Sequence, residues 1–459
     1  MHKILNMKKI IYIINVFLLS SIFNLLPLTG QTLISTVEEL AAINTDDLSL
    51  KGEYLLTKDL VLENWTPIGT GKSPFVGIFD GYGHTITILS FKVNTNIENK
   101  AFNTISIGLF GSIGKGSVVK NLRVAGELSY DSGPITLYMG AIAGDNNGTI
   151  MNCISTANIN ANGGQLTSGR AWAKFGLSLL GSANSNYTTY LAYQNEACGG
   201  GITGVNKNLI ENCYATGNIT VSGEGHKNAG GIAGRNGFTD IMVDNIRNNL
   251  SGNLKGGVII YCYATGNISA KQDVATRQAG GITGMSMPGS VTNSVALNKK
   301  VETIGRSKGV GFGGLGVGYP ANLAFGVTSY NILEPILGSI PTRGFALFMS
   351  NVKICYVRNN ITNYINYGNS MKNAYYRNDM EVYMEKDEEG DMKNKVNNKK
   401  LFLQTRGEKI EYTSTQEESW WTDNKSGVFY NFGSDENNPW VWVSELKRPA
   451  LFWEIIPFD

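Results

Sequence analysis

A glycine-rich motif that recurs about every 30 residues constrains the fold of this chain most strongly. Copies such as GGITG and GGIAG begin at residues 108, 140, 200, 230 and 280, so successive starts differ by 32, 60, 30 and 50. The base period is therefore about 30 residues, interrupted by insertions. A second box follows each copy, and in LIENCYATGNI (209–219) apolar and polar residues mostly alternate, as they do in β-strands.

A unit of short strands and glycine corners cannot bury its inner face alone, and stacking successive units closes the core. We therefore predict an all-β fold, a right-handed parallel β-helix (β-solenoid) with inserted loops and a C-terminal cap. No long helical period is evident after residue 31. At 42% hydrophobic residues the chain can bury a large core.

Equivalent positions of the second box should form ladders up the stack, with rungs about 4.8 Å apart. One ladder is of small to medium residues that suit the interior, namely Leu122, Cys153, Cys213, Cys262 and Ser294. The positions before it should form stacked amide hydrogen bonds, and they are Asn121, Asn152, Asn212, Tyr261 and Asn293. The positions after it should point outward, and they are Arg123, Ile154, Tyr214, Tyr263 and Val295.

These boxes resemble the GLUG repeat of bacterial surface proteins. The best copy is GGITGVNKNLIENCYATGNIT (200–220), and WTPIG (65–69) and FVGIFDGYGHTI (75–86) look like the opening signatures of such domains. WVWVSELKRPALFW (440–453) looks like their closing segment. The resemblance covers roughly 50–300 well and 415–455 loosely, whereas 301–415 departs from the pattern. It implies the fold, and it implies surface display and adhesion without an assigned chemistry.

Related repeats also occur beside IgA-specific metallopeptidase domains. That activity needs His-Glu-x-x-His, which places two zinc ligands and a glutamate base on one helix. The histidines of this chain are His2, His84 and His226, and none lies in such a motif. The sequence therefore excludes this metallopeptidase.

Four regions follow from these patterns. Three lysines precede an apolar run from Ile10 to Leu28, which predicts a signal peptide at 1–30, cleaved near Gly30. An uncleaved membrane anchor is the alternative. We expect a GLUG-type solenoid at 31–300, degenerate rungs and irregular insertions at 301–415, and a Trp-rich C-terminal cap at 416–459.

The cap assignment depends on the need to cover an open solenoid end. The tryptophans expected in it are Trp420, Trp421, Trp440, Trp442 and Trp453. Ligand binding by these rings is the alternative interpretation.

Charge limits the classes of partner. The chain has 39 Lys and Arg against 37 Asp and Glu, a formal charge of +2, and three of the lysines lie in the signal segment. A nucleic-acid binder needs a basic face, so we expect no nucleic-acid partner. The membrane should matter only for secretion or surface attachment.

Many secreted parallel β-helices cut polysaccharides, and such a site needs clustered carboxylates. The acids Asp80, Asp145, Glu211 and Asp240 fall at different points of the repeat, so we expect no catalytic residues, no metal and no cofactor. The FDGYGH turn (79–84) is better explained as a tight structural corner than as an Asp80–His84 pair.

Five cysteines form no even disulfide framework. Cys153, Cys213 and Cys262 share an inward position, where a free thiol behaves as a small hydrophobe. A disulfide between neighbouring rungs remains the alternative.

Binding should depend on loops that leave the coil. The insertion 161–197 carries aromatic residues among small polar ones, and these are Trp172, Phe175, Tyr187, Tyr190 and Tyr193. They suit sugar or protein contact, unless the loop folds back and its rings cover the core. Tyr214 and Tyr263 could form a stacked outward platform, or could simply stabilise neighbouring strands.

The sequence therefore predicts a secreted or cell-surface, adhesin-like binding or display module without catalysis. The partner would be an unidentified host or matrix glycan or protein. A polysaccharide lyase or glycosidase with a side-wall groove is the second hypothesis, and a purely structural surface stalk is the third.

Overall fold

The computed structural model describes most of the repeat region and parts of the C-terminal third. The described residues are 30–93, 104–164, 196–223, 225–237, 256–271, 277–286, 289–304, 322–325, 369–386, 392–395, 408–423, 428 and 430–455. Residues 1–29 of the expected signal segment and 165–195 of the aromatic insertion lie outside this set.

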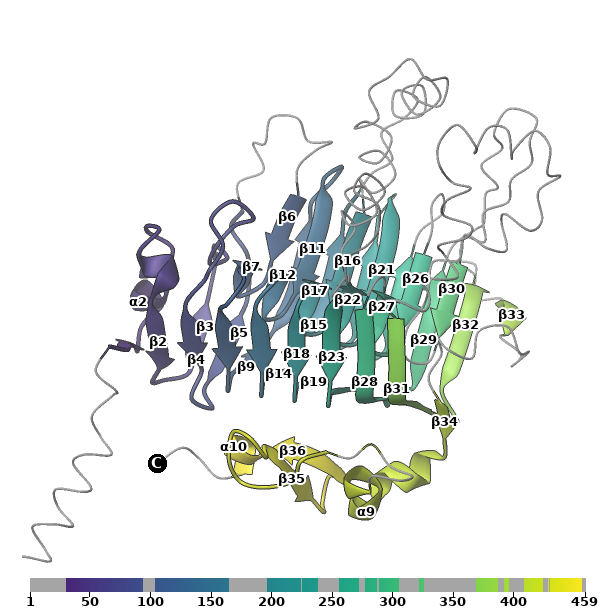
Figure 1. Ribbon diagram of the computed structural model, residues 1–459. Coiled ribbons are helices and arrows are strands. Elements are labelled where there is room, and N and C mark those ends of the chain that lie inside the picture. Colours follow the sequence, from purple (N-terminus) through teal and green to yellow (C-terminus); the bar gives the residue numbers. More distant parts are fainter. Residues whose placement is uncertain are drawn as a thin grey trace, which may run out of the picture.

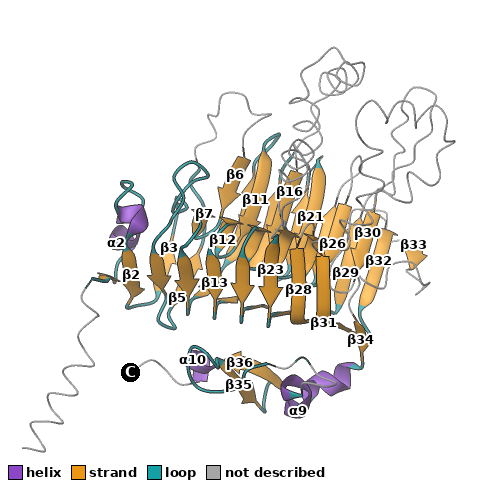
Figure 2. Cartoon of the chain, viewed as in Figure 1, coloured by secondary structure: helices purple, strands orange, loops and turns teal. Residues whose placement is uncertain are grey.

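Five short strands make up one pass of the chain around the stack. One such pass comprises β16 (Glu196–Gly200), β17 (Thr203–Asn206), β18 (Leu209–Glu211), β19 (Tyr214–Ala215) and β20 (Ile219–Ser222). Each strand pairs in parallel with its equivalents in the preceding and following passes. The described chain is thus all-β with long parallel sheets and few helices, an arrangement consistent with a parallel β-solenoid (Figures 1 and 2).

The preceding passes are β1 (Thr32–Ile34), β2 (Glu53–Leu56), β3 (Leu60–Leu62), β4 (Ile78–Asp80), β5 (Thr85–Ile88), β6 (Thr104–Ile107), β7 (Phe110–Ile113), β8 (Val118–Lys120), β9 (Arg123–Ala125), β10 (Glu127–Asp131), β11 (Thr136–Gly140), β12 (Ala143–Asn146), β13 (Thr149–Met151), β14 (Ile154–Ser155) and β15 (Asn158–Asn162). The following passes are β21 (His226–Gly230), β22 (Ala233–Asn236), β23 (Gly257–Ile260), β24 (Tyr263–Ala264), β25 (Ile268–Lys271), β26 (Arg277–Gly280), β27 (Thr283–Ser286), β28 (Gly289–Ala296), β29 (Lys300–Ile304), β30 (Asn322–Phe325), β31 (Asn369–Arg377), β32 (Glu381–Lys386) and β33 (Met392–Lys395). Strands β30, β31 and β32 still pair in parallel with the pass before them, so parallel stacking continues beyond residue 300.

The core is a set of apolar ladders along the stack. The central isoleucine of the glycine box is fully buried in four successive copies, Ile142, Ile202, Ile232 and Ile282. The backbone amide of each of the first three donates to the carbonyl of the next, at 2.8–3.0 Å. Each buried isoleucine side chain contributes about 1.5–3 kcal/mol relative to an exposed one, so the repeated box forms a continuous apolar column.

The glycines of the box are required by backbone contact. A Cβ on Gly230 would lie 2.0 Å from the carbonyl oxygen of Ala233, and one on Gly234 would lie 2.6 Å from the amide nitrogen of Gly199. Any side chain would therefore push β21 and β22 away from their neighbours. The motif recurs along the chain because each pass makes the same close corner.

The predicted asparagine ladder has a different cause from the one expected. Asn121, Asn152 and Asn212 adopt φ of 52°, 51° and 50°, the left-handed region that asparagine tolerates better than most residues. Asn293 (φ 45°) and Tyr261 (φ 53°) occupy the same corner. Stacked amide bonds appear only in part, because Asn152 donates to Asn121 at 3.5 Å whereas Asn212 accepts from Trp440.

A second asparagine ladder lies in the core and was not predicted. Asn146, Asn206 and Asn236 are fully buried, and their amides form a chain of hydrogen bonds of 2.9 Å each. The sequence signal was present, because each residue follows a glycine box by two positions. Buried amides must be satisfied, so this ladder fixes the register of successive passes.

A short helix covers the first pass. In α2 (Val37–Ala42), Thr36 and Glu39 form a capping box, and Leu40 is fully buried. A 3-10 turn, η1 (Ser49–Lys51), follows. Six residues are too few to show a helical period in the sequence, and the Thr-x-x-Glu spacing is the one local signal of this helix.

The C-terminal segment, defined as the described residues from 408 to 455, does not cap the end of the stack as expected. It comprises β34 (Glu408–Ile410), η3 (Tyr412–Gln416), α9 (Glu418–Thr422), β35 (Trp440–Val443), β36 (Arg448–Leu451) and α10 (Phe452–Ile455). The segment runs back along one side of the strands (Figure 1). The segment contacts widely separated passes: Glu436 binds Lys120 of β8, and the carbonyl of Pro449 accepts a hydrogen bond from Tyr263 of β24. It lies there because outward aromatic residues offer an apolar surface to bury.

Among the described residues, no helix has the length and apolar character needed to cross a membrane.

Candidate functional site

The outward ladder beneath the C-terminal segment is an aromatic stack. Tyr214 and Tyr263 lie with ring centroids 4.7 Å apart and planes 5° from parallel. They point away from the solenoid core, as predicted, but they are only 3% and 0% exposed because Trp421, Tyr430 and Trp440 cover them. Of the two alternatives for Tyr214 and Tyr263, a platform open to a ligand does not fit, because this surface is already occupied, whereas the stacked rings agree with a pair that stabilises neighbouring strands.

The covering tryptophans are fixed by their indole N–H groups. Trp440 donates to the side-chain oxygen of Asn212 at 3.0 Å, and Trp453 donates to the carbonyl of Asn152 at 3.2 Å. A buried indole needs a partner, and the left-handed asparagine corner presents these acceptors to the segment. The tryptophans therefore bind the side of the stack, and ligand binding by Trp440 and Trp453 would require the segment to leave it.

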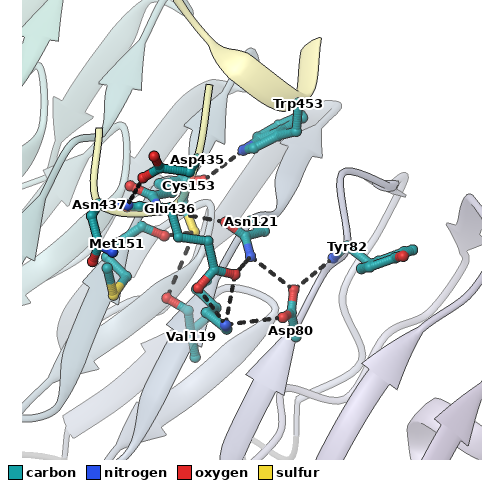
Figure 3. A network of polar contacts seen from close by, with 12 residues as sticks. Asp80, Tyr82, Val119, Asn121, Met151, Cys153, Asp435, Glu436, Asn437 and Trp453 are labelled. Carbon is teal, nitrogen blue, oxygen red and sulfur yellow. Dashed lines mark hydrogen bonds and ion pairs between the residues drawn. The ribbon is translucent and has the colours of Figure 1, made fainter. Parts of the chain in front are cut away.

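Ionic contacts fix the segment over the earlier passes. Glu436 accepts from Lys120 at 2.7 and 2.9 Å and from the Asn121 amide at 2.7 Å. Figure 3 shows Glu436 beside Asn121, whose amide also contacts Asp80, and Asp80 lies 3.2 Å from the Lys120 ammonium. Burial alone would lower the pKa of Lys120, but the hydrogen bond that Lys120 donates to Glu436 and the charge of Asp80 outweigh burial and raise that pKa.

A second carboxylate, that of Glu454, also fixes the C-terminal segment to the stack. Glu454 accepts from Arg123 at 2.8 Å and from the Tyr214 hydroxyl at 2.7 Å. Burial, followed by the charge of Glu454, raises the pKa of Tyr214, so this hydroxyl remains a donor at physiological pH.

An open cavity lies where the C-terminal segment meets the later passes. It measures about 330 Å³, and we call it the seam pocket. Its lining comes from the turns after β24 and β28, the end of β31, η3 and the β35–β36 turn. The lining residues are Thr265, Leu297, Lys299, Arg377, Tyr412, Thr415, Leu446, Lys447 and Arg448. Four of these nine residues are cations and none is an acid.

One of the four cations already has a partner. Arg377 forms two hydrogen bonds to Asp379, at 2.6 and 2.7 Å, and lies 3.6 Å from the centroid of the Tyr412 ring. The Arg377 hydrogen bonds hold the pKa of Asp379 below its ordinary value. Arg377 therefore orders the floor of the pocket and contributes little net charge.

The other three cations leave the pocket positive. Within the described ranges, no carboxylate lies at ion-pair distance from Lys299, Lys447 or Arg448. The Arg448 guanidinium lies 5.6 Å from the centroid of the Tyr214 ring, which orients it. Lys299 and Lys447 are exposed at the rim. This arrangement can attract and hold an anion.

Sequence reasoning did not find the seam pocket. Lys299, Arg377, Tyr412 and Arg448 are separated by 30 or more residues along the chain, and none lies in a recognisable motif. The pairing of β28 with β31 brings Arg377 beside the turn that carries Lys299, and the return of the C-terminal segment along the stack adds Tyr412 and Arg448.

A buried polar cluster on β11, β16 and β22 is the strongest alternative site. Arg235 is bonded to Glu196 and donates to the Tyr138 hydroxyl at 3.2 Å, while Asn228 donates to the other Glu196 oxygen at 3.2 Å. Arg235 and Glu196 are 0% and 4% exposed. Burial raises the pKa of the adjacent Cys198. The carboxylate is enclosed by its own partners, and removal of either charge would leave the other buried and uncompensated, so the cluster offers no free group to a ligand.

The acids weighed for polysaccharide cleavage have separate partners. Asp80 is bound to Lys120, and Asp145 is 2.7 Å from Lys207. Burial raises the pKa of Glu211, which lies on another corner. Asp80 also accepts from the Tyr82 amide at 2.9 Å, and Tyr82 has a φ of 49°, so the FDGYGH turn is a structural corner. Asp240 lies outside the described residues.

The remaining predicted residues divide into two groups. Cys153, Cys213 and Cys262 are fully buried and free, and the backbone amide of Cys153 lies 3.4 Å from the sulfur of Cys213. The aromatic residues of the 161–197 insertion lie outside the described residues, so their role stays a prediction; they are Trp172, Phe175, Tyr187, Tyr190 and Tyr193.

In the described part of the chain, no group of three or more His, Cys, Asp or Glu residues is placed to hold a metal ion.

Comparisons with known proteins give short and distant likenesses. No model of a known protein family matches the chain. Over 88 residues, 19% of the chain, it is 38% identical to a "Putative Gly-rich membrane protein" of Evansella cellulosilytica. Over 144 residues, 28% of the chain, it is 26% identical to "Halomucin" of Haloquadratum walsbyi. The matches span only 9% and 1% of those two proteins.

One solved structure has a similar outline. It is described as a "putative immunoglobulin A1 protease" from Bacteroides ovatus, is 15% identical, and matches with a TM-score of 0.45 over 92% of each chain. This likeness is too distant to carry an argument about activity. The GLUG resemblance therefore rests on the motifs quoted above.

Proposed function

We propose that this chain is a secreted or cell-surface, adhesin-like binding and display module that acts without catalysis. Its scaffold is a right-handed parallel β-helix exported by an N-terminal signal peptide, and its ligand is a glycan or protein of a host or matrix. The supporting observation is the seam pocket, where Lys299 of the stack meets Lys447 and Arg448 of the C-terminal segment. Among the described residues, none of these three cations has a carboxylate at ion-pair distance. Rigid elements that carry exposed, unsatisfied polar groups favour binding.

The insertion 161–197 would supply a second contact region. Its aromatic residues among Gly, Ser, Asn and Thr suit recognition of sugar or protein surfaces.

The test is a glycan and host-matrix array probed with the full chain, a variant that lacks 165–195, and a pocket variant with Lys299→Gln and Lys447→Gln. Binding that falls in either variant would support the proposal and locate the contact. An unchanged binding pattern would place recognition elsewhere on the stack. Absence of binding to every component would contradict the proposal and favour a structural stalk.

A turnover screen on the same polysaccharides tests the catalytic alternative. Release of new reducing ends or of unsaturated products, abolished by a substitution at Asp145 or Glu211, would overturn the non-catalytic assignment.

A further inference from the structure

The seam pocket has a size that limits what it can bind. Its volume of 330 Å³ lies at the small end of the range of ligand sites, which runs from about 300 to 1,000 Å³. A cavity of this size accommodates one ring-sized unit and excludes a folded epitope. The ligand must therefore present its anion on a small unit or at a chain end.

The uncharged lining suits a polyhydroxylated ring. The Thr265 side chain brings a hydroxyl, and Leu446, 54% exposed, places an apolar surface beside the cations. A sugar ring offers both hydroxyl groups and an apolar C–H face, whereas a free inorganic anion uses neither. The combination of cations, hydroxyl and apolar side chain favours a sugar over a bare anion.

Lys447 occupies a position where a lysine is costly. Its φ is 49°, in the left-handed region that glycine or asparagine adopts more easily. This charged residue in a strained turn lines the rim of a pocket that Lys299 and Arg448 also line. Strain of this kind tends to persist where the residue has a function.

We infer that the seam pocket binds a single acidic sugar unit, with Lys299, Lys447 and Arg448 holding its carboxylate or sulfate group. This inference rests on the proposed function and names the ligand class for it. Thr265 and Leu446 contact the ring, while Arg377, fixed by Asp379 and Tyr412, keeps the pocket floor in place.

The test is calorimetric titration of the full chain with five probes: glucuronate, glucose 6-sulfate, glucose, inorganic sulfate and a short poly-aspartate peptide. We expect glucuronate or glucose 6-sulfate to bind at least about tenfold more tightly than glucose and inorganic sulfate, a difference of about 1.4 kcal/mol. Which of the two acidic sugars binds decides between a carboxylate and a sulfate. Affinity should fall as salt rises from about 50 to about 500 mM, because exposed charges are screened.

Substitutions in the pocket identify the site. Lys299→Gln with Lys447→Gln should weaken acidic-sugar binding about tenfold or more, and Arg448→Lys should weaken it less because the charge remains. The matched control is Lys72→Gln with Lys115→Gln, two exposed lysines far from the pocket, and it should bind as the unaltered chain does. Equal thermal unfolding of all variants shows that each is folded.

Three results would overturn the inference. They are acidic-sugar binding that the pocket variant leaves unchanged, binding of inorganic sulfate or poly-aspartate in preference to both acidic sugars, and no binding of any acidic sugar. If neutral glycans or matrix proteins still bind on the array, the proposed function stands while the inference falls. If nothing binds in either experiment, both fail.

Discussion

At the scale of single residues, asparagine serves this chain in two distinct ways. At the corners, Asn121, Asn152 and Asn212 are tolerated because the backbone there is left-handed. In the core, Asn146, Asn206 and Asn236 are needed because their amides satisfy one another. The two roles predict different sensitivities to substitution. Glycine at a corner keeps the left-handed backbone and loses the side-chain contacts to the C-terminal segment, whereas the core positions accept no apolar residue.

Replacement of Asn206 by Ala should lower the free energy of unfolding by about 2–4 kcal/mol, because Asn146 and Asn236 each lose a buried partner. The measurement is the shift of the denaturant midpoint. Asn160→Ala, at an exposed position on β15, serves as the control and should change stability by less than about 0.5 kcal/mol. Equal effects of the two substitutions would contradict the role of the ladder.

The glycine box allows an equally local prediction. Gly234→Ala places a Cβ 2.6 Å from the Gly199 amide nitrogen, so β22 must shift. We expect the free energy of unfolding to fall by about 2 kcal/mol or more. Gly71, which has no atom within 4 Å of a Cβ, should accept alanine without loss. Thermal unfolding of both variants checks this, and a harmless Gly234→Ala would refute the close-contact explanation.

At the scale of elements, the C-terminal segment is the unexpected feature. The tryptophans of this segment predict a cover for the open end of the stack, but they pack instead on the apolar surface that the outward tyrosines of β19 and β24 provide along its side. The segment is held to the stack by ion pairs at Lys120 and Arg123 and by aromatic contacts at Tyr214 and Tyr263. The turn between β35 and β36 then completes the seam pocket.

The Lys120–Glu436 contact should weaken at alkaline pH. The folded chain raises the pKa of Lys120 above 10.5, so the contact stabilises the docked segment fully below that pH and is lost as pH rises through the higher folded pKa. The protection factors of residues 431–440, which correct for the base-catalysed rise of intrinsic amide exchange with pH, should fall over this alkaline window. Glu436→Gln should raise exchange already at neutral pH and reduce its alkaline dependence.

The control for this experiment is Glu445→Gln, a substitution at an exposed carboxylate in the same segment. It should leave exchange of residues 431–440 unchanged. Unaltered exchange in Glu436→Gln would mean that the aromatic contacts alone hold the segment.

At the scale of the whole molecule, stability is distributed along the stack. Each pass contacts mainly its two neighbours, so the ladders of isoleucine, cysteine and asparagine couple one pass to the next. The polar cluster around Arg235 and Glu196 joins three passes on another side. Disturbing one pass should therefore weaken its neighbours before it affects distant ones.

The cysteine ladder reports on this coupling. In a Cys355→Ser background, Cys153, Cys198, Cys213 and Cys262 should resist a thiol reagent in native buffer, because all four are buried and burial raises the pKa of Cys213. Labelling should follow denaturation, as read by mass spectrometry. Fast labelling of Cys213 at neutral pH would show that the passes open locally.

The sequence by itself determined the repeat, the parallel stacking, the inward cysteines and the outward direction of Tyr214 and Tyr263. These depend on local period and on glycine corners, which are physical constraints within about 30 residues of chain. It did not determine that the two tyrosines are covered, nor that the asparagine corner follows from a left-handed backbone.

Only the tertiary structure decided where the C-terminal segment lies, and therefore which residues form the seam pocket. Lys299, Arg377, Lys447 and Arg448 share no local pattern, and their proximity follows from the burial of Trp421 and Trp440 against the side of the stack. Burial of apolar surface is non-directional, so sequence identifies the residues that must be covered but not the face of the molecule that covers them.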